Sequence, residues 1–94
     1  MNYTDTISID LRENNLAGTI PSEIGRLQNL VVMNTEGNPG LMGPFPDEIC
    51  QLEMRKGQGQ LRAAFVNCST VSCEDSCTAC ICADVTYNGD DEFY

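Results

Sequence analysis

One segment of the chain occurs twice, and this internal repeat limits the possible fold more than any other feature. Residues 9–21 (IDLRENNLAGTIP) return in outline as residues 33–46 (MNTEGNPGLMGPFP). Each copy runs into a matching tail, PSEIGRL at 21–27 and PDEICQL at 46–52. Self-similarity at a period of a few tens of residues is typical of stacked units that bury their apolar edges against one another. We therefore expect the two copies to lie side by side.

The residue types within each copy predict its local structure. Ile9 and Leu11 alternate, so they point to the same side of a short strand. Asn14 and Asn38 suit a buried turn in which the side-chain amide satisfies backbone groups. Gly18 and Gly43, which follow these Asn residues in the two copies, permit a turn that a Cβ would obstruct. An apolar residue and Pro then precede a short helical or 3-10 turn.

A third strand is expected within residues 61–68 (LRAAFVNC), in one of two registers. Because side chains alternate along a strand, a slip of one residue moves every side chain to the other face. If Cys68 takes the position of the repeated Asn, Ala63 and Phe65 point inward. In the other register, Ala64 and Val66 point inward. We favour the register with Phe65 inward.

The repeats resemble plant-type leucine-rich repeats, whose pattern reads L-x-x-L-x-L-x-x-N-x-L-x-G-x-I-P-x-x-L-G-x-L-x-x-L. The first copy, residues 6–30, departs from the pattern only at its first position and by Ile-for-Leu exchanges. The second copy has one extra residue and carries Met33, Thr35 and Cys50 where the pattern has Leu, Leu and Gly. The resemblance covers residues 6–52, and the G-x-I-P element is specific to this class.

This resemblance implies a right-handed α/β solenoid with parallel strands, short helical or 3-10 turns and an irregular disulfide-rich C-terminal cap. The expected strands lie near 8–11, 32–35 and 63–67. The expected organisation is leucine-rich repeats over 1–67, a Cys-rich cap over 68–83 and an acidic flexible tail over 84–94.

Five of the six cysteines lie close together near the C-terminus. Cys73, Cys77, Cys80 and Cys82 could offer four thiolates to zinc, and the C-T-A-C stretch could be a redox pair. The cramped spacing instead favours disulfides, whose pairing stays open, and the segment resembles the Cys-rich endings of diatom leucine-rich repeat proteins. A disulfide from Cys50, the one cysteine outside this segment, would fix the segment against the end of the repeats. We expect no metal and no other cofactor. The disulfide candidates are Cys50, Cys68, Cys73, Cys77, Cys80 and Cys82.

Charge and composition argue against several classes of function. The chain has 14 acidic and five basic residues, a net charge of −9, and a phosphate backbone would repel it. It has no His, the commonest general base, so we expect no enzyme.

No apolar stretch is long enough to span a membrane. The first residues lack the features of a signal peptide, while the cysteines suggest an oxidising compartment, so we expect a C-terminal piece of a longer protein.

The expected function is a non-enzymatic protein–protein interaction or recognition module, extracellular or at the cell surface, in a receptor-like protein. The resemblance implies a protein or cell-wall ligand and no nucleic acid. The alternative is a structural or metal-binding Cys-rich protein with the repeats as scaffold.

A lone fragment should be weakly stable and associate through Ile7, Ile9 and Ile20. The concave-face interaction candidates are Ser8, Asp10, Arg12, Glu13, Val32, Asn34 and Glu36. The glycosylation candidates are Asn2 and Asn67, each in an N-x-S/T sequon.

Overall fold

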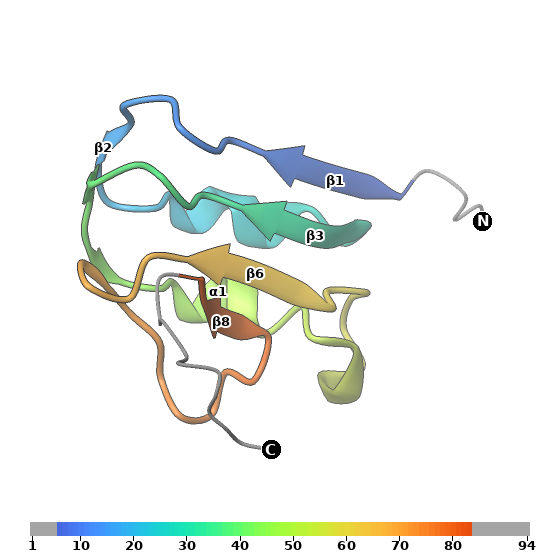
Figure 1. Ribbon diagram of the computed structural model, residues 1–94. Helices are drawn as coiled ribbons and strands as arrows, with labels where there is room; N and C mark the ends of the chain where they lie inside the picture. The colour runs from blue at the N-terminus through green and yellow to red at the C-terminus, as the bar shows by residue number, and fades with distance from the viewer. Residues whose placement is uncertain (1–5, 84–94) are drawn as a thin grey trace, which may run out of the picture.

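A computed structural model describes residues 6–83 and shows a four-stranded, wholly parallel sheet (Figure 1). Each neighbouring pair in the sheet is parallel, and the order of the strands follows the chain. The two copies of the repeat supply the first two strands, which lie side by side. The strands are, in order, β1 (Ile7–Asp10), β3 (Leu30–Asn34), β6 (Ala63–Val66) and β8 (Cys80–Cys82).

Two further sheets have only two strands each. One pairs β2 (Ala17–Gly18) with β4 (Gly40–Leu41), and the other pairs β5 (Gly43–Pro44) with β7 (Val71–Ser72). Gly18 and Gly43, the repeated glycines, both have φ of 91°. This left-handed conformation is costly for residues with a Cβ, which explains glycine in both copies.

Three short helices complete the described structure. The 3-10 helix η1 (Ser22–Arg26) and the α-helix α1 (Asp47–Cys50) follow the two repeated prolines, and η2 (Met54–Lys56) is a second 3-10 helix. η1 packs directly on α1, behind the sheet in Figure 1. The contact is close because a Cβ at Gly25 would lie 2.7 Å from the Cβ of Glu48.

The expectation of an α/β solenoid is wrong. Residues 6–83 form strands of two to five residues in three small sheets with almost no helix, and no solenoid is recognised there. The only α-helix in this part of the chain has four residues. Turns, two-residue strands and helices of three to five residues divide the connections between the long strands, and the first two connections also contain proline. These interruptions leave no long uninterrupted stretch in which an α-helix could nucleate and propagate.

The C-terminal segment is also more regular than the expected irregular cap. It contributes β7 to a two-stranded sheet and β8 to the edge of the main sheet. The division into repeats at 1–67 and a cap at 68–83 stays a prediction, although β8 continues the same sheet as β1. The expected tail at 84–94 lies outside the described residues.

The favoured register of the third strand is wrong. Ala64 and Val66 are fully buried in β6, whereas Phe65 is half-buried on the opposite face. The cause is the pairing with β3, which sets Ala64 beside Met33, a core residue that is itself fully buried. The apolar side chains of the core lie between the sheet and the helices. They include Leu30, Met33, Phe45, Ile49, Leu61, Ala64, Val66 and Val71.

The three isoleucines expected to drive association differ in exposure. Ile7 and Ile9 are half-buried at the first strand of the sheet, but Ile20 is only 4% exposed and belongs to the core. Ile20 is therefore not available for association. Among the described residues, no helix has the length and apolar character needed to cross a membrane.

Candidate functional site

The predicted interaction residues lie along one face of the main sheet. Ser8 and Asp10 are exposed on β1, and they pair in register with Val32 and Asn34 of β3, which are half-buried. Paired residues in neighbouring strands point to the same face. Arg12, Glu13 and Glu36 follow the ends of these strands, where Arg12 and Glu13 are exposed and Glu36 is half-buried.

This face continues onto two residues that the sequence did not indicate. Asn34 pairs with Phe65 of β6, and Phe65 pairs with Ile81 of β8. One row across the sheet therefore reads Asp10, Asn34, Phe65, Ile81. Ile81 is 38% exposed, so part of its apolar side chain faces solvent. The face thus changes from polar at β1 to apolar at β8, and we call this row the cross-strand row.

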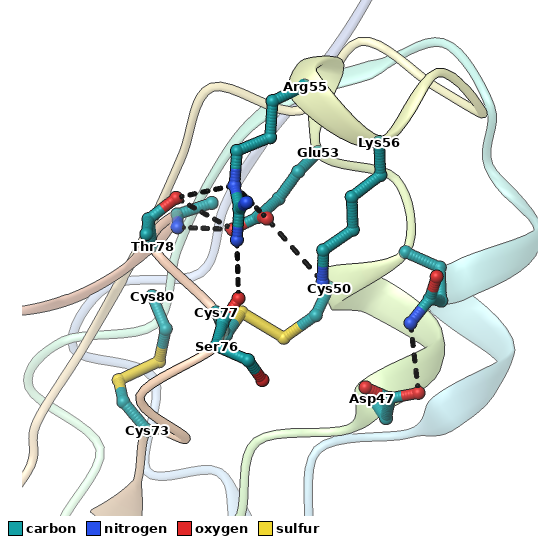
Figure 2. Close-up of a disulfide and its surroundings, with 12 residues drawn as sticks. Asp47, Cys50, Glu53, Arg55, Lys56, Cys73, Ser76, Cys77, Thr78 and Cys80 are labelled. Carbon is teal, nitrogen blue, oxygen red and sulfur yellow. Dashed lines mark hydrogen bonds and ion pairs between the residues drawn. A yellow bond between two sulfur atoms is a disulfide. The ribbon is translucent and has the colours of Figure 1, made fainter.

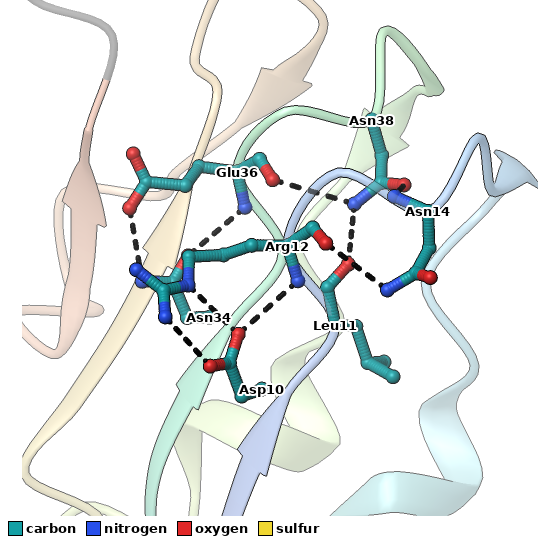
Figure 3. A network of polar contacts seen from close by, with 7 residues as sticks. All are labelled: Asp10, Leu11, Arg12, Asn14, Asn34, Glu36 and Asn38. Atoms are coloured by element: carbon teal, nitrogen blue, oxygen red, sulfur yellow. Dashed lines mark hydrogen bonds and ion pairs between the residues drawn. The ribbon is translucent and has the colours of Figure 1, made fainter.

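Asp10 and Arg12 form a two-point ion pair at the polar end of the row (Figure 3). The Nε and Nη2 atoms of Arg12 each donate a 2.8 Å hydrogen bond to a different carboxylate oxygen of Asp10. The backbone N–H of Arg12 adds a 3.2 Å bond to Asp10. The side-chain and backbone hydrogen bonds from Arg12 lower the pKa of Asp10 to about 2. The guanidinium is therefore held in one orientation against a permanent carboxylate.

A second polar pair stands beside the first on the neighbouring strand. The Nδ2 atom of Asn34 donates to Oε1 of Glu36 at 2.9 Å, and the backbone N–H of Glu36 donates to Oδ1 of Asn34 at 3.0 Å. A hollow of about 430 Å³ is lined by Asp10, Arg12 and Glu13. The polar end of the face therefore offers oriented donors and acceptors around a recess.

The turns below this face are held by Asn38, which is 1% exposed. Its Oδ1 accepts hydrogen bonds from the backbone N–H groups of Asn14 and Leu16, both at 2.9 Å. Its Nδ2 donates to the carbonyl oxygens of Leu11 at 2.8 Å and Thr35 at 2.9 Å (Figure 3). One side chain thus joins the turns of both copies.

The equivalent residue of the first copy behaves differently. Asn14 is exposed, and its Nδ2 donates to the carbonyl oxygen of Arg12 at 3.0 Å. The expectation of a buried turn residue therefore holds for Asn38 and is wrong for Asn14. The physical reason is that, within residues 6–83, the Asn14 turn is packed on one side by the second copy, whereas the Asn38 turn lies between the first copy and Asn67. Glu13 and Asn15 flank it with φ of 58° and 56°.

All six cysteines are paired in three disulfides. Cys50 pairs with Cys77 across 27 residues, Cys68 with Cys82 across 14, and Cys73 with Cys80 across seven. The first bridge joins α1 to the cap and is buried, because Cys50 is 1% and Cys77 3% exposed. The four cysteines considered for zinc do not meet as a group, since Cys77 is bonded to Cys50.

Besides the disulfides, the buried carboxylate of Glu53 anchors the cap (Figure 2). The sequence did not indicate this residue. Its side chain is 3% exposed and accepts hydrogen bonds from the backbone N–H of Ala79 at 2.6 Å and from Oγ1 of Thr78 at 3.2 Å. Nε of Arg55 lies at 3.0 Å and Nζ of Lys56 at 3.6 Å from Oε1. A single Glu in a turn-rich linker carries no pattern that could have revealed this role.

The pKa of Glu53 shows that the anchor is well satisfied. Burial alone would raise that pKa, but the Ala79 hydrogen bond, the Arg55 charge, the Thr78 hydrogen bond and the Lys56 charge together lower it. Arg55 also donates from Nη2 to the carbonyl oxygen of Ser76. The carboxylate therefore stays ionised and joins the linker after α1 to the loop before β8.

The two glycosylation candidates differ in what the structure describes. Asn2 lies outside the described residues. Asn67 is half-buried, and its Oδ1 accepts a 2.7 Å hydrogen bond from the backbone N–H of Gly37. Its amide thus helps to connect β6 with the turn after β3.

Comparison with known proteins adds no relative to this description. No protein family, no curated protein and no solved structure matches the chain.

Proposed function

We propose that this chain is a non-enzymatic interaction module of leucine-rich repeat type that binds a protein or cell-wall ligand through its exposed sheet face. The observation that supports this most is the cross-strand row, Asp10, Asn34, Phe65 and Ile81. It combines an aromatic and an aliphatic side chain with an oriented ion pair. Aromatic anchors beside satisfied polar groups are typical of protein-binding surfaces.

The proposed setting is extracellular, in a secreted or receptor-like protein. Three disulfides in a protein of this size are consistent with secretion or an extracellular location, because such bonds persist in oxidising compartments. The net charge of −9 supports a partner other than nucleic acid.

The test is ligand capture by the immobilised chain, using extracellular proteins of the source organism and, separately, its isolated cell-wall polysaccharide. Asp10→Lys and Ile81→Asp change opposite ends of the cross-strand row. Glu23→Lys, an exposed change in η1, is the matched control. We expect both face variants to lose a ligand that the unchanged chain and Glu23→Lys retain.

The proposal fails if no ligand is retained or if the face variants keep every ligand. Circular dichroism spectra matching those of the unchanged chain are required of each variant, so that a loss of binding reports on the face and not on unfolding.

The alternative function is a structural or metal-binding Cys-rich protein. One observation favours the structural role: three disulfides tie α1 and the segments that follow β6 and β7 to the region of β8.

A further inference from the structure

An open groove lies at the end of the main sheet where β6 and β8 begin. It has a volume of about 370 Å³ and is formed by the linker after α1, the residues before β6 and the loop before β8. We call it the linker groove. The hollow beside Asp10 lies where β1 ends, so the two recesses stand at opposite ends of the parallel sheet.

The linker groove is held in shape by the buried carboxylate of Glu53. This carboxylate accepts hydrogen bonds from Thr78 and Ala79 of the loop and from Arg55 of the linker (Figure 2). A backbone bridge between Glu53 and Leu61 joins the linker to the residues before β6. The three segments are therefore connected before any ligand binds, and a site ordered in advance loses less entropy on binding.

Positive charge gathers at the linker groove although the chain as a whole is acidic. Arg55, Lys56 and Arg62 are three of the five basic residues in a chain with a net charge of −9. Among the described residues that line the groove, Glu53 is the one acid, and it is already paired with Arg55 and Lys56. Three cations against one carboxylate leave a local charge of +2.

Arg62 supplies the charge that can meet a ligand. Its side chain is exposed and lines the groove, and the ion pairs within residues 6–83 involve Arg12, Arg55 and Lys56 but not Arg62. Its backbone N–H donates to the carbonyl oxygen of Val31 at 2.8 Å, which fixes its main chain against β3. A guanidinium in this position can bind a carboxylate through two parallel hydrogen bonds.

Apolar side chains lie beside these cations. Met54 lines the groove and is 53% exposed, whereas Leu61 and Ala79 are only 2% and 4% exposed and belong to the core. An unbranched thioether side chain adapts to the shape of an apolar partner. The linker groove thus offers an apolar surface next to an arginine that has no carboxylate partner in the described chain.

From these observations we propose that the linker groove is a second protein-binding site, and that its partner is an acidic peptide segment in which a carboxylate is next to an apolar side chain. The carboxylate pairs with the guanidinium of Arg62, and the apolar side chain packs on Met54. A basic peptide is repelled by the local charge of +2, and a neutral peptide leaves Arg62 without a counter-charge.

The experiment titrates the full chain, with its disulfides intact, with three short capped peptides of equal length and follows the backbone amide signals by NMR. The peptides alternate Leu with Glu, Gln or Lys, so they differ in charge and share their apolar residues. We expect the Glu peptide to bind and to shift the amide signals of Met54, Arg62 and Ala79. The Gln peptide should bind about fivefold more weakly, and the Lys peptide should not bind in the groove. Added salt should weaken binding of the Glu peptide, because exposed ion pairs are screened.

Two matched pairs of variants locate the site. Arg62→Gln and Arg26→Gln each remove one exposed cation, the first from the groove and the second from η1. Met54→Gln and Met42→Gln each replace a methionine that is 53% exposed. The two groove variants should weaken binding of the Glu peptide by about threefold to fivefold, and the two controls should leave it unchanged. Amide spectra of the free variants that match the unchanged chain away from the substitution show that each one is folded.

Several results would overturn the proposal. One is failure of the Glu peptide to bind, which includes the case in which the acidic segment 84–94 of the chain already fills the groove. Others are equal binding of the Glu, Gln and Lys peptides, shifts confined to β1 and β3, and controls that weaken binding as much as the groove variants. None of these results decides whether the sheet face captures a ligand, so the two proposals are tested separately.

Discussion

The backbone N–H of Ala79 donates a 2.6 Å hydrogen bond to the buried carboxylate of Glu53, 26 residues earlier in the chain. Ala79 is itself buried and directly precedes β8. This bond, together with the Cys50–Cys77 bridge, joins the linker region to the cap. These two connections join the residues just before β8 to α1 and the linker, while the pairing with β6 sets the register of Ile81.

Glu53→Gln should destabilise the protein by about 1–3 kcal/mol, because a charged acceptor of buried donors is replaced by an amide that must present an N–H₂ group to one of them. Urea denaturation followed by circular dichroism measures this change. Glu48→Gln, at an exposed position of α1, should change stability by less than about 0.5 kcal/mol. Equal effects of the two substitutions would contradict the anchoring role.

The same residue predicts a pH dependence. Folding lowers the pKa of Glu53, so its contribution to stability is complete above its unfolded value of about 4.3 and is lost as the pH falls through the folded value. The unchanged chain should therefore lose stability in mildly to strongly acidic solution, and Glu53→Gln should lose less over this range. Parallel stability curves for the two proteins would argue against the lowered pKa.

Arg12→Ala should release the carboxylate of Asp10 from its ion pair. The pKa of Asp10, about 2 in the unchanged chain, should rise toward the ordinary value of about 3.9. A carboxyl-carbon NMR titration of Asp10 measures this directly. Arg26→Ala, an exposed change in η1, serves as control, and a shift of the same size in that variant would show that net charge and not the ion pair is responsible.

Asn38→Ala and Asn14→Ala compare the two copies of the repeat at one position. Asn38 satisfies two N–H groups and two carbonyl groups from a buried position, so its loss should cost on the order of 3 kcal/mol. Asn14 is exposed, and its loss should cost about 0.5 kcal/mol or less. Denaturant midpoints measure both values, and similar costs would refute the asymmetry between the copies.

The disulfides should contribute to stability in the order of the loops that they close. Removal of Cys50–Cys77, with its 27-residue separation, by paired Ala substitutions should cost about 3.5 kcal/mol by loop entropy, and removal of Cys73–Cys80 about 2.5 kcal/mol. Thermal and urea unfolding of the two double variants test this order. A reversed order would show that loop entropy does not govern this cap.

A part of this structure could be predicted from local patterns. The alternation at Ile9 and Leu11 and the second copy of the repeat placed strands near 8–11 and 32–35, within two residues of β1 and β3, although Leu11 itself lies just outside β1. The repeated Gly positions adopt the left-handed conformation that turns require. Six cysteines in a short chain indicated disulfides, and all six are paired. Alternation and turn glycines act within a few residues, and the repeat and the number of cysteines can be read from the sequence without knowing which residues meet in space.

The fold class and much of the candidate site could not be predicted in this way. The resemblance led to an α/β solenoid, whereas the segments between the long strands are interrupted by turns and two-residue strands and contain only short helices. The sequence of β6 is apolar on both faces, so alternation alone could not choose between Phe65 and Ala64 as the inward residue.

The sequence by itself determined where short strands begin, where turns need Gly and that the cysteines would be oxidised in pairs. Only the tertiary structure decided which cysteines pair, that Glu53 anchors the cap, and that Phe65 and Ile81 extend the polar face of β1. The physical reason is that strand alternation and turn chemistry are local properties of the chain. Register, disulfide partners and buried charges depend instead on neighbours tens of residues away, as the pairing of Met33 with Ala64 shows.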